Sequence, residues 1–300
     1  MTAAIPSPPP RTLASGQRCR VRVFDVVTRA VETVHETDTV LLEAPNWHPD
    51  GRLVLNGDGV LWSLDPASGD LARIEIDGVP DLNNDHVLAP DGETIYVSAN
   101  DWHIYQAPLV GGTARRVTAD RDGRMHFLHG VSPDGTALAY IGLQPADGDW
   151  WARAEVFVTA VDGSWERRLE AAGSPADGSE FSPDGAWIYL NTEAFTEAPG
   201  HAQIARIRPG GTGVERLTVS DRVDWFPHLA PDGHHTVYLS YPAGTIGHPP
   251  DLDVELRLVT GDAWDAPETV VALHGGQGTI NVNSWAPDSR RFAFVDYPLD

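Results

Sequence analysis

The chain has 300 residues, of which 41% are hydrophobic and 21% charged, as is typical of a globular protein with a sizeable core. No run approaches the roughly 18 apolar residues that a membrane-spanning helix needs, so we expect no membrane insertion. The net charge of −22 disfavours nucleic acid and anionic membranes as partners, because both are polyanions that bind basic surfaces.

The first residues, Met1–Pro10, read MTAAIPSPPP and lack the basic and apolar regions of a secretory signal. We therefore expect a disordered tail over residues 1–16. Cys19 is the one cysteine, so no intramolecular disulfide can form. Both observations favour a cytoplasmic location.

A turn motif recurs along the whole chain. Pro-Asp-Gly occurs five times and is followed by one Pro-Asp-Ser, at spacings of 41, 43, 50, 48 and 56 residues; the six copies begin at Pro49, Pro90, Pro133, Pro183, Pro231 and Pro287. Proline presets φ at the first corner of a tight turn, aspartate bonds nearby backbone, and glycine accepts a positive φ. This repetition predicts a repeat architecture.

Strand patterns surround each copy of the turn. Alternating apolar residues follow it, as at 94–98, 137–141 and 187–190, and further strand-like runs and glycine-containing turns come next. Four antiparallel strands in a unit of 40 to 50 residues are typical of a propeller blade. The sequence therefore predicts an all-β, six-bladed β-propeller over residues 17–300.

The last unit is incomplete, because the chain ends after an inner strand near 281–285 and a second strand at 292–295. The N-terminal region supplies two surplus strands, at 21–25 and 30–34. Combining the two ends makes one blade and leaves no unpaired strand edge in the ring. We expect blade six to consist of residues 17–36 and 277–300.

With these repeats, the chain resembles the TolB-type (WD40-like) propeller family, whose Ser-Pro-Asp-Gly turn is found at 132–135 and 182–185. The likeness covers residues 17–300. Matching segments are Asn84-Asp85-His86, His129-Gly130, Glu180, Trp225-Phe226-Pro227-His228 and 276–281. The resemblance implies a propeller but no particular activity, because members range from protein-interaction platforms to enzymes such as oligogalacturonate lyase.

Polar side chains occur just before the turn in several units. His86 and His129 lie four residues before their turn prolines, whereas Glu180 and His228 lie three before theirs; Asn283 and Asn46 occupy such positions in units six and one. Gln277 and Asn281 lie further upstream in unit six. Innermost strands line the channel of a propeller, so we expect these side chains to converge, although a shift of one residue reverses the side of a strand that a residue faces.

Imidazole together with carboxylate or amide oxygen suits Zn, Mn, Fe or Ni. The resemblance to oligogalacturonate lyase, which holds a metal with histidines and a glutamine, implies His86, His129, His228 and Gln277 as ligands of a divalent metal. Glu180 or Asp85 would act as a base or orient a histidine. The remaining polar or ring-bearing residues of the channel are expected to bind substrate: Asn46, Trp225, Asn281 and Asn283. In the alternative interpretation the histidines are structural and Trp225 packs between blades.

Two functions remain open. The first is a metal-dependent lyase or isomerase that acts on a small polar, sugar-acid-like molecule in the channel. The second is a non-catalytic propeller that binds a protein partner on one face. The insertions at 144–153 and 243–253 are candidates for covering the channel entrance. Other histidines, His248 among them, have no supporting pattern.

Overall fold

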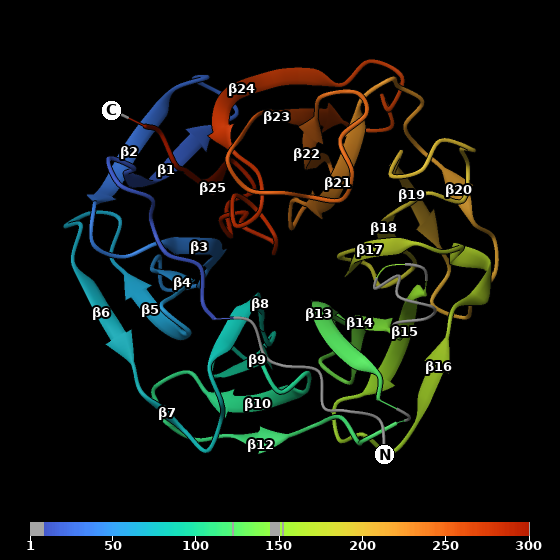
Figure 1. The fold of residues 1–300 in the computed structure, drawn as a ribbon, viewed down its shortest axis with the longest axis horizontal. Coiled ribbons are helices and arrows are strands. Elements are labelled where there is room, and N and C mark those ends of the chain that lie inside the picture. The colour runs from blue at the N-terminus through green and yellow to red at the C-terminus, as the bar shows by residue number, and fades with distance from the viewer. Residues whose placement is uncertain (1–8, 122, 145–150, 152, 300) are drawn as a thin grey trace.

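The computed structural model describes residues 9–121, 123–144, 151 and 153–299. The described chain forms β-sheets arranged as six sectors around a central axis (Figure 1). One short 3₁₀ helix, η1 (Glu170–Ala172), is the only helix in these ranges. Among the described residues no helix has the length and apolarity needed to cross a membrane. The all-β, six-bladed propeller predicted from the repeats is confirmed.

Each of the first five blades is a four-stranded antiparallel sheet whose strands run outward from the axis in chain order. Blade one contains β3 (Leu42–Trp47), β4 (Leu53–Gly57), β5 (Val60–Leu64) and β6 (Leu71–Ile74). Blade two contains β8 (Leu82–Leu88), β9 (Thr94–Ala99), β10 (Ile104–Pro108) and β12 (Arg115–Arg116). Blade three contains β13 (Met125–Val131), β14 (Ala137–Leu143), β15 (Ala154–Ala160) and β16 (Glu166–Arg168).

Blade four contains β17 (Ala176–Phe181), β18 (Ile188–Thr192), β19 (Gln203–Ile207) and β20 (Glu215–Arg216). Blade five contains β21 (Val223–Leu229), β22 (His235–Tyr241), β23 (Leu252–Thr260) and β24 (Glu268–Gly275). A short parallel pair, β7 (Ile76–Asp77) with β11 (Gly112–Thr113), connects blades one and two.

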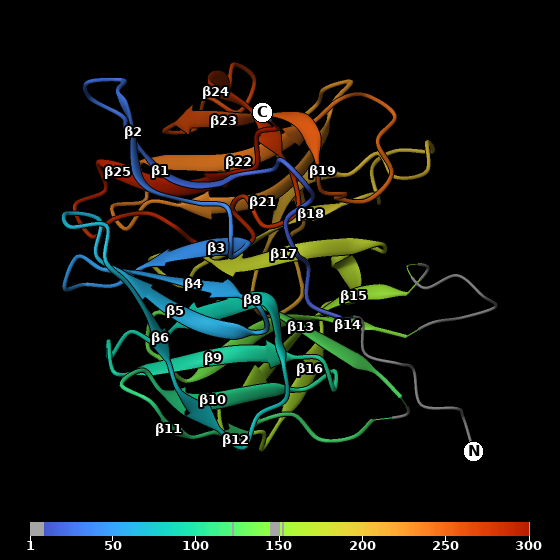
Figure 2. The same cartoon turned by 60° about the vertical axis from the view of Figure 1, so that its left-hand side comes forward.

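The two ends of the chain close the ring. In blade six, β1 (Cys19–Asp25) pairs antiparallel with β2 (Val31–Thr37) on one side and with β25 (Arg291–Asp296) on the other (Figure 2). This confirms that N- and C-terminal strands share the closing blade. The inner segment expected as a strand at 281–285 forms a single bridge, Trp285 with Phe292, in place of a regular ladder.

The repeated turns have the geometry that their residues dictate. Gly92, Gly135 and Gly185 have φ of 69°, 70° and 69°, a region that costs glycine little. The preceding aspartates accept hydrogen bonds from the backbone just beyond the turn; for example, Glu93 N donates to Asp91 Oδ1 over 2.8 Å. These bonds favour the ionised form and lower the pKa of Asp91 despite the opposing effect of desolvation.

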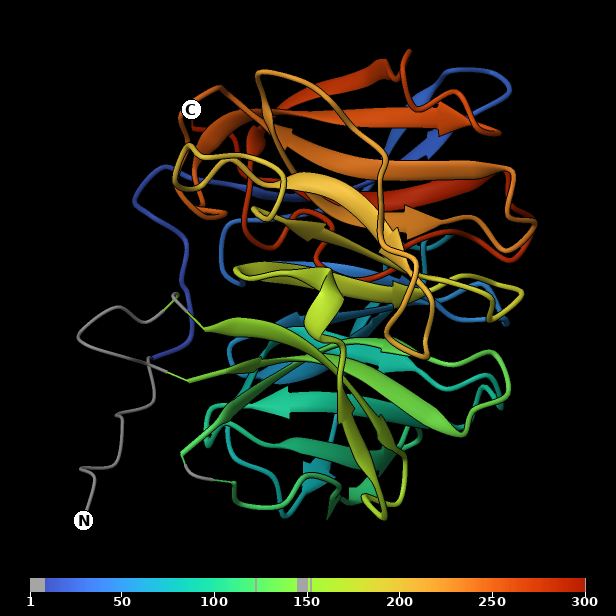
Figure 3. The same ribbon diagram turned by 90° about the vertical axis from the view of Figure 1, so that its right-hand side faces the viewer.

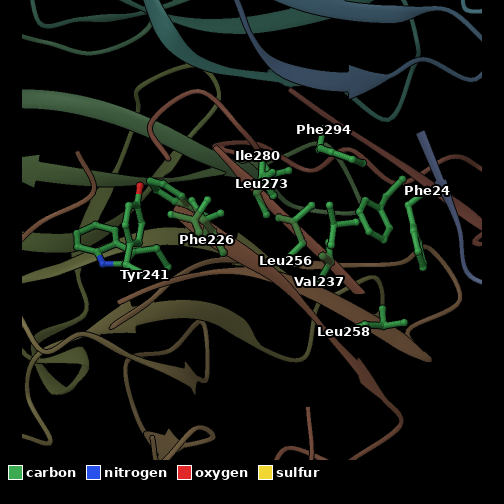
Figure 4. Packing of buried hydrophobic residues seen from close by; sticks show 14 of the residues in the cluster. Phe24, Phe226, Val237, Tyr241, Leu256, Leu258, Leu273, Ile280 and Phe294 are labelled. Atoms are coloured by element: carbon green, nitrogen blue, oxygen red, sulfur yellow. The ribbon is translucent and has the colours of Figure 1, made fainter. Parts of the chain in front are cut away.

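The core lies between neighbouring blades. Figure 4 shows one such layer, in which Phe24 and Phe294 of blade six lie near Val237, Leu256 and Leu258 of blade five. All five side chains are almost fully removed from solvent. Burial of such side chains stabilises the fold by roughly 1.5–3 kcal/mol each, so packing between blades holds the ring together.

The N-terminal segment runs along the same face of the ring as the C-terminus, as the side view in Figure 3 shows. Gln17 forms a bridge with Leu299, and Arg18 N donates to Pro298 O over 3.0 Å. Residues 1–8 of the predicted tail lie outside the described residues. From residue 9 the chain is described, and Arg11 belongs to the contacts of the propeller rather than to a tail.

Candidate active site

A bulge interrupts the innermost strand of every complete blade. The pairing register shifts in β3, β8, β13, β17 and β21. In three of these strands the bulged residue has a positive φ: 53° at Ala44, 63° at Gly178 and 54° at Phe226. A bulge redirects the residues on either side of it. The residues before the bulge therefore have different surroundings from those after it.

The residues before the bulge occupy one repeat position, six residues ahead of the turn proline. In the six units this position holds Glu43, Asn84, Phe127, Asp177, Trp225 and Asn281. Asn84, Phe127, Asp177 and Asn281 line one cavity near the axis. Glu43 contacts Asn84, and the ring of Trp225 lies 4.5 Å from that of His248, which also lines the cavity.

This cavity, which we call the hub pocket, has a volume of about 220 Å³. Its residues come from the inner strands β8, β13, β17 and β21, from β14, and from the loops after β9, β14, β22 and β24. They are Asn83, Asn84, Asp85, Asn100, Trp102, Phe127, His129, Ile141, Trp151, Asp177, Phe226, His248, Gln277 and Asn281. Apolar walls with a few convergent polar groups are typical of small-molecule sites.

A buried ion pair lies in the hub pocket. His129 Nε2 is 2.7 Å from Asp177 Oδ1, and the two side chains are 4% and 7% exposed. Burial alone would lower the pKa of His129, but the carboxylates of Asp177 and Asp85 outweigh burial and raise it to about 9. Burial would raise the pKa of Asp177, and the attraction of His129 instead lowers it. The pair is therefore charged at neutral pH.

Asp85 is the second carboxylate of the hub pocket. Asn83 holds it from two sides, since Asn83 Nδ2 donates to Asp85 Oδ2 over 3.1 Å and Asp85 N donates to Asn83 Oδ1 over 2.9 Å. Burial raises the pKa of Asp85 to about 7, with repulsion from Asp177 and Glu43 adding to the effect and His129 opposing it. Asp85 can therefore take up or release a proton near neutral pH.

His248 comes from the loop between β22 and β23 and lies between Asp177 and Gln277. Its Nε2 lies 3.5 Å from Asp177 Oδ2, and its Nδ1 bonds Gln277 Oε1. Asn281 Nδ2 donates to the same Gln277 oxygen over 3.1 Å, and Gln277 Nε2 donates to Asn84 Oδ1 over 3.2 Å. Burial lowers the pKa of His248, which keeps this imidazole neutral.

The described N-terminal segment supports this network from outside. Arg11 Nη1 lies 2.7 Å from both Glu43 Oε1 and the carbonyl oxygen of Gln277. Asn84 Nδ2 donates to Glu43 Oε1 over 3.4 Å. Arg11 thus neutralises a buried carboxylate next to the hub pocket and fixes the backbone of Gln277.

Aromatic rings line the pocket. The ring centroids of Trp102 and Phe127 are 6.0 Å apart. Phe226 stacks on His129 at 5.9 Å, and Trp151 lies edge-on to His248 at 6.2 Å. These rings give flat apolar surfaces for a ring-shaped ligand.

The residues after the bulge form a separate structure, which we call the inter-blade belt: Glu180, His228, Asn283 and Asn46. Glu180 Oε2 bonds His228 Nδ1 at 2.6 Å, and Glu180 Oε1 accepts Asn283 Nδ2 at 2.7 Å. Asn46 Nδ2 donates to the backbone oxygen of Asn283 over 2.5 Å. Both nitrogens of His228 are engaged, since Nε2 bonds the carbonyl oxygen of Ile280. The belt joins blades to one another and does not line the hub pocket.

His86 has a third location. It is fully buried, and its Nε2 lies 3.4 Å from the carbonyl oxygen of Val54 in blade one. Burial lowers the pKa of His86 to about 4, so the imidazole is neutral. His86 packs between blades and does not line the hub pocket.

The structure thus divides the residues predicted from the sequence. Asp85, His129, Gln277 and Asn281 meet in the hub pocket; Glu180, His228, Asn46 and Asn283 form the belt, while His86 and Trp225 pack elsewhere. The four expected metal ligands are not brought together, because His129 and Gln277 line the hub pocket whereas His86 and His228 pack between blades. In the described part of the chain, no three or more His, Cys, Asp or Glu side chains form a group that could hold a metal ion.

Sequence reasoning missed Asp177, Asn84 and His248. Asp177 and Asn84 occupy the position six residues before the turn proline. This position recurs as regularly as the positions three and four residues before the proline. His248 lies in the insertion at 243–253, and the expectation that insertions cover the channel entrance fits its place in the pocket. Of the insertion at 144–153, residues 145–150 and 152 lie outside the described residues, and Trp151 lines the pocket.

Comparisons with known proteins identify the family to which the chain belongs. It is 39% identical over 287 residues to the uncharacterized protein Atu1656 of Agrobacterium fabrum, covering 93% of this chain and 92% of that protein. A solved structure of a candidate TolB from Agrobacterium tumefaciens shares 37% identity and a TM-score of 0.84, covering 94% of this chain and 99% of the other. The chain belongs to the TolB-like β-propeller family. No family model matches it.

More distant members of the fold include an enzyme. An oligogalacturonate lyase in complex with manganese superimposes with a TM-score of 0.55 at 12% identity, covering 90% of this chain and 75% of that one. At this identity the likeness shows a shared fold. A shared fold does not fix an activity, so the function of this chain depends on the residues of its own pocket.

Proposed function

We propose that this TolB-like propeller is an enzyme of the lyase or isomerase type, which transfers a proton on a small polar molecule bound in the hub pocket. The observation that supports this most is that Asp85 and His129 line the same pocket and both have raised pKa values. The pKa of Asp85 is about 7 and that of His129 about 9. Titratable groups with perturbed pKa values in one cavity are typical of acid–base sites.

Each of three pocket residues would have its own role in the reaction. Asp85, when ionised, is the base that removes a proton from a carbon next to a carbonyl group of the substrate. His129, held protonated by Asp177, stabilises the negative charge that develops on the carbonyl oxygen. Asp177 is a positioning residue, because it fixes the imidazole through the bond to Nε2. For an isomer, Asp85 returns the proton to the former carbonyl carbon while the neighbouring hydroxyl group passes its proton to the former carbonyl oxygen. For a lyase product, a β-substituent leaves with its bonding electrons and takes the proton from Asp85, so that a carbon–carbon double bond forms.

The metal dependence and the sugar-acid substrate expected from the resemblance to oligogalacturonate lyase have less support. Of the expected ligands only His129 and Gln277 line the pocket; His129 Nε2 bonds Asp177, and Gln277 Oε1 already accepts two bonds. The described residues of the pocket therefore do not fit a divalent cation. Metal analysis of untagged protein tests this directly, and a stoichiometric transition metal would contradict it.

The proposed function can be tested by isotope exchange. The protein is incubated in D₂O with a mixture of hexoses, hexosamines and hexuronic acids, and mass spectrometry follows the incorporation of deuterium at carbon. We expect wild-type protein to label at least one compound, and Asp85→Asn to abolish labelling because amide cannot act as the base. Asp120→Asn, an identical change at a side chain that is 81% exposed, is the control. Absence of labelling by wild-type protein would contradict the proposal.

A further inference from the structure

The charged groups that line the hub pocket are unusual for a site that receives an anion. Two carboxylates, Asp85 and Asp177, and two imidazoles, His129 and His248, line it, and no lysine or arginine is among its described lining residues. The guanidinium of Arg11, which contacts the backbone of the lining residue Gln277, is already paired with Glu43 at 2.7 Å. A carboxylate or phosphate ligand would therefore meet no uncommitted permanent cation.

The ion pair between Asp177 and His129 leaves Asp85 as the group that sets the net charge of the pocket. Asp177 and His129 form one ion pair at 2.7 Å, so their charges compensate each other. His248 is neutral, since burial lowers its pKa. Asp85 is left with amide neighbours: Asn83 donates to it, and Asn84, Asn100 and Gln277 line the same cavity. The pocket is thus neutral or carries one negative charge.

The aromatic side chains that line the pocket also favour a positively charged ligand. The faces of aromatic rings carry negative electrostatic potential and attract cations at distances up to about 6 Å. Four aromatic side chains line the pocket: Trp102, Phe127, Trp151 and Phe226. A volume of about 220 Å³ has room for one small ring. The overall charge of −22 also raises the local concentration of cations.

We propose that the hub pocket takes a small ring-bearing molecule with a protonated amine, whose ammonium group lies beside Asp85 and whose ring lies against the aromatic walls. The proposal rests on the proposed function and specifies its substrate class. It replaces the sugar acid implied by the distant lyase with a molecule of opposite charge.

The test uses two sets of probes that share a ring and differ in charge. The first set is glucosamine, glucose and glucuronate; the second is benzylamine, benzyl alcohol and benzoate. Binding is measured by calorimetry at millimolar concentration and constant ionic strength. We expect the amine of at least one set to bind about tenfold or more tightly than its neutral counterpart, and the carboxylate to bind most weakly. Tightest binding by a carboxylate, or no binding by either amine, would overturn the proposal.

A matched pair of variants assigns the effect to the pocket. Asp85→Asn keeps the shape of the side chain and removes its charge, so the preference for the amine over the neutral probe should fall to less than about threefold. Asp120→Asn removes an exposed carboxylate and should leave the preference unchanged. An equal loss in both variants would mean that the net charge of the protein, rather than the pocket, selects the amine.

The outcomes separate this inference from the proposed function. Labelling of a neutral sugar or a sugar acid in D₂O, without amine selectivity, would retain the enzyme and reject the amine. Amine selectivity without any labelling would retain the ligand class and reject the chemistry.

Discussion

Asp85 and His129 both hold their protons more firmly than the same groups do in water, for different physical reasons. For Asp85 the main cause is burial, which disfavours the charged form. For His129 the attraction of Asp177 and Asp85 exceeds the effect of burial. At neutral pH the pocket therefore contains a group that can exchange a proton next to one that stays positively charged.

The pKa of Asp85 predicts how the stability of the protein depends on pH. Because its pKa is raised from 3.8 to about 7, the folded state favours the neutral carboxyl, and stability is lost as pH rises from about 4 to 7. Asp85→Asn cannot ionise, so it should stabilise the fold at pH 8, by about 2–4 kcal/mol, and have little effect near pH 4. Urea denaturation at both pH values checks this, with Asp120→Asn as control; equal effects at the two pH values would contradict it.

His228 illustrates the other kind of buried histidine. Both ring nitrogens bond protein groups, and the side chain is almost fully buried. His228→Ala should therefore destabilise the fold by about 2–4 kcal/mol, since Glu180 loses a buried partner. Ligand binding in the hub pocket should change less than twofold at a temperature where the variant is folded. His234→Ala, at an exposed neighbouring turn, is the control, and a selective loss of binding in His228→Ala would place His228 in the site.

At the scale of strands, the bulge is the feature that builds the pocket. Gly178 shows why the chain needs particular residues there: its φ is +63°, and an added Cβ would lie 2.9 Å from Asn191 Oδ1 and 3.3 Å from the Cα of Phe226. Asp177 immediately precedes this residue. The position of the ion pair between Asp177 and His129 thus depends on a backbone conformation rather than on side-chain packing alone.

Replacement of this glycine gives a test at the same scale. Gly178→Ala should destabilise the protein by about 1–3 kcal/mol, because alanine is strained at positive φ and crowds blade five. The displaced Asp177 should also weaken its bond to His129 and lower the pKa of that histidine. Gly233→Ala, at a turn with a similar φ of +69° and no atom within 4 Å of the added Cβ, is the control for strain alone. An equal pKa of His129 in both variants would contradict this role of the bulge.

The bulges also explain how far the site could be predicted from the sequence. The repeated turn identified the propeller and the shared closing blade, because turn chemistry and strand alternation are local. It also placed Asp85, His129, Gln277 and Asn281 near the axis. The prediction that His86 and His228 lie in one site with His129 and Gln277 was wrong. A bulge changes the direction of nearby side chains, and no local sequence pattern marks where a bulge occurs. His248 reaches the pocket from a loop, where spacing carries no information.

At the scale of the whole molecule, ring closure depends on blade six, which combines both ends of the chain. Asp296 of β25 is buried and bonds two arginines of β1: Arg20 through two bonds of 2.8 and 2.7 Å, and Arg22 at 2.8 Å. These bonds reinforce the ladder between β1 and β25 where the ring closes. Closure in turn fixes Gln277 and Asn281 opposite the inner strands of blades two to four.

Loss of the contact between Asp296 and the two arginines should destabilise the closing blade. Asp296→Ala leaves two guanidinium groups without their buried partner, so we expect a loss of about 2–4 kcal/mol in the free energy of unfolding. Asp288→Ala removes an exposed ion pair with Arg291 in the same blade and should cost less than about 1 kcal/mol. Equal costs in thermal and urea denaturation would contradict the special role of Asp296.

The central claim is that Asp177 holds His129 protonated in the hub pocket, and NMR titration of the His129 imidazole tests it most directly. We expect a pKa of about 9 in the wild-type protein, and a fall toward or below the ordinary value of 6.5 in Asp177→Asn, because burial then acts without its main opposing charge. A wild-type pKa at or below 6.5, or one that Asp177→Asn leaves unchanged, would contradict the account.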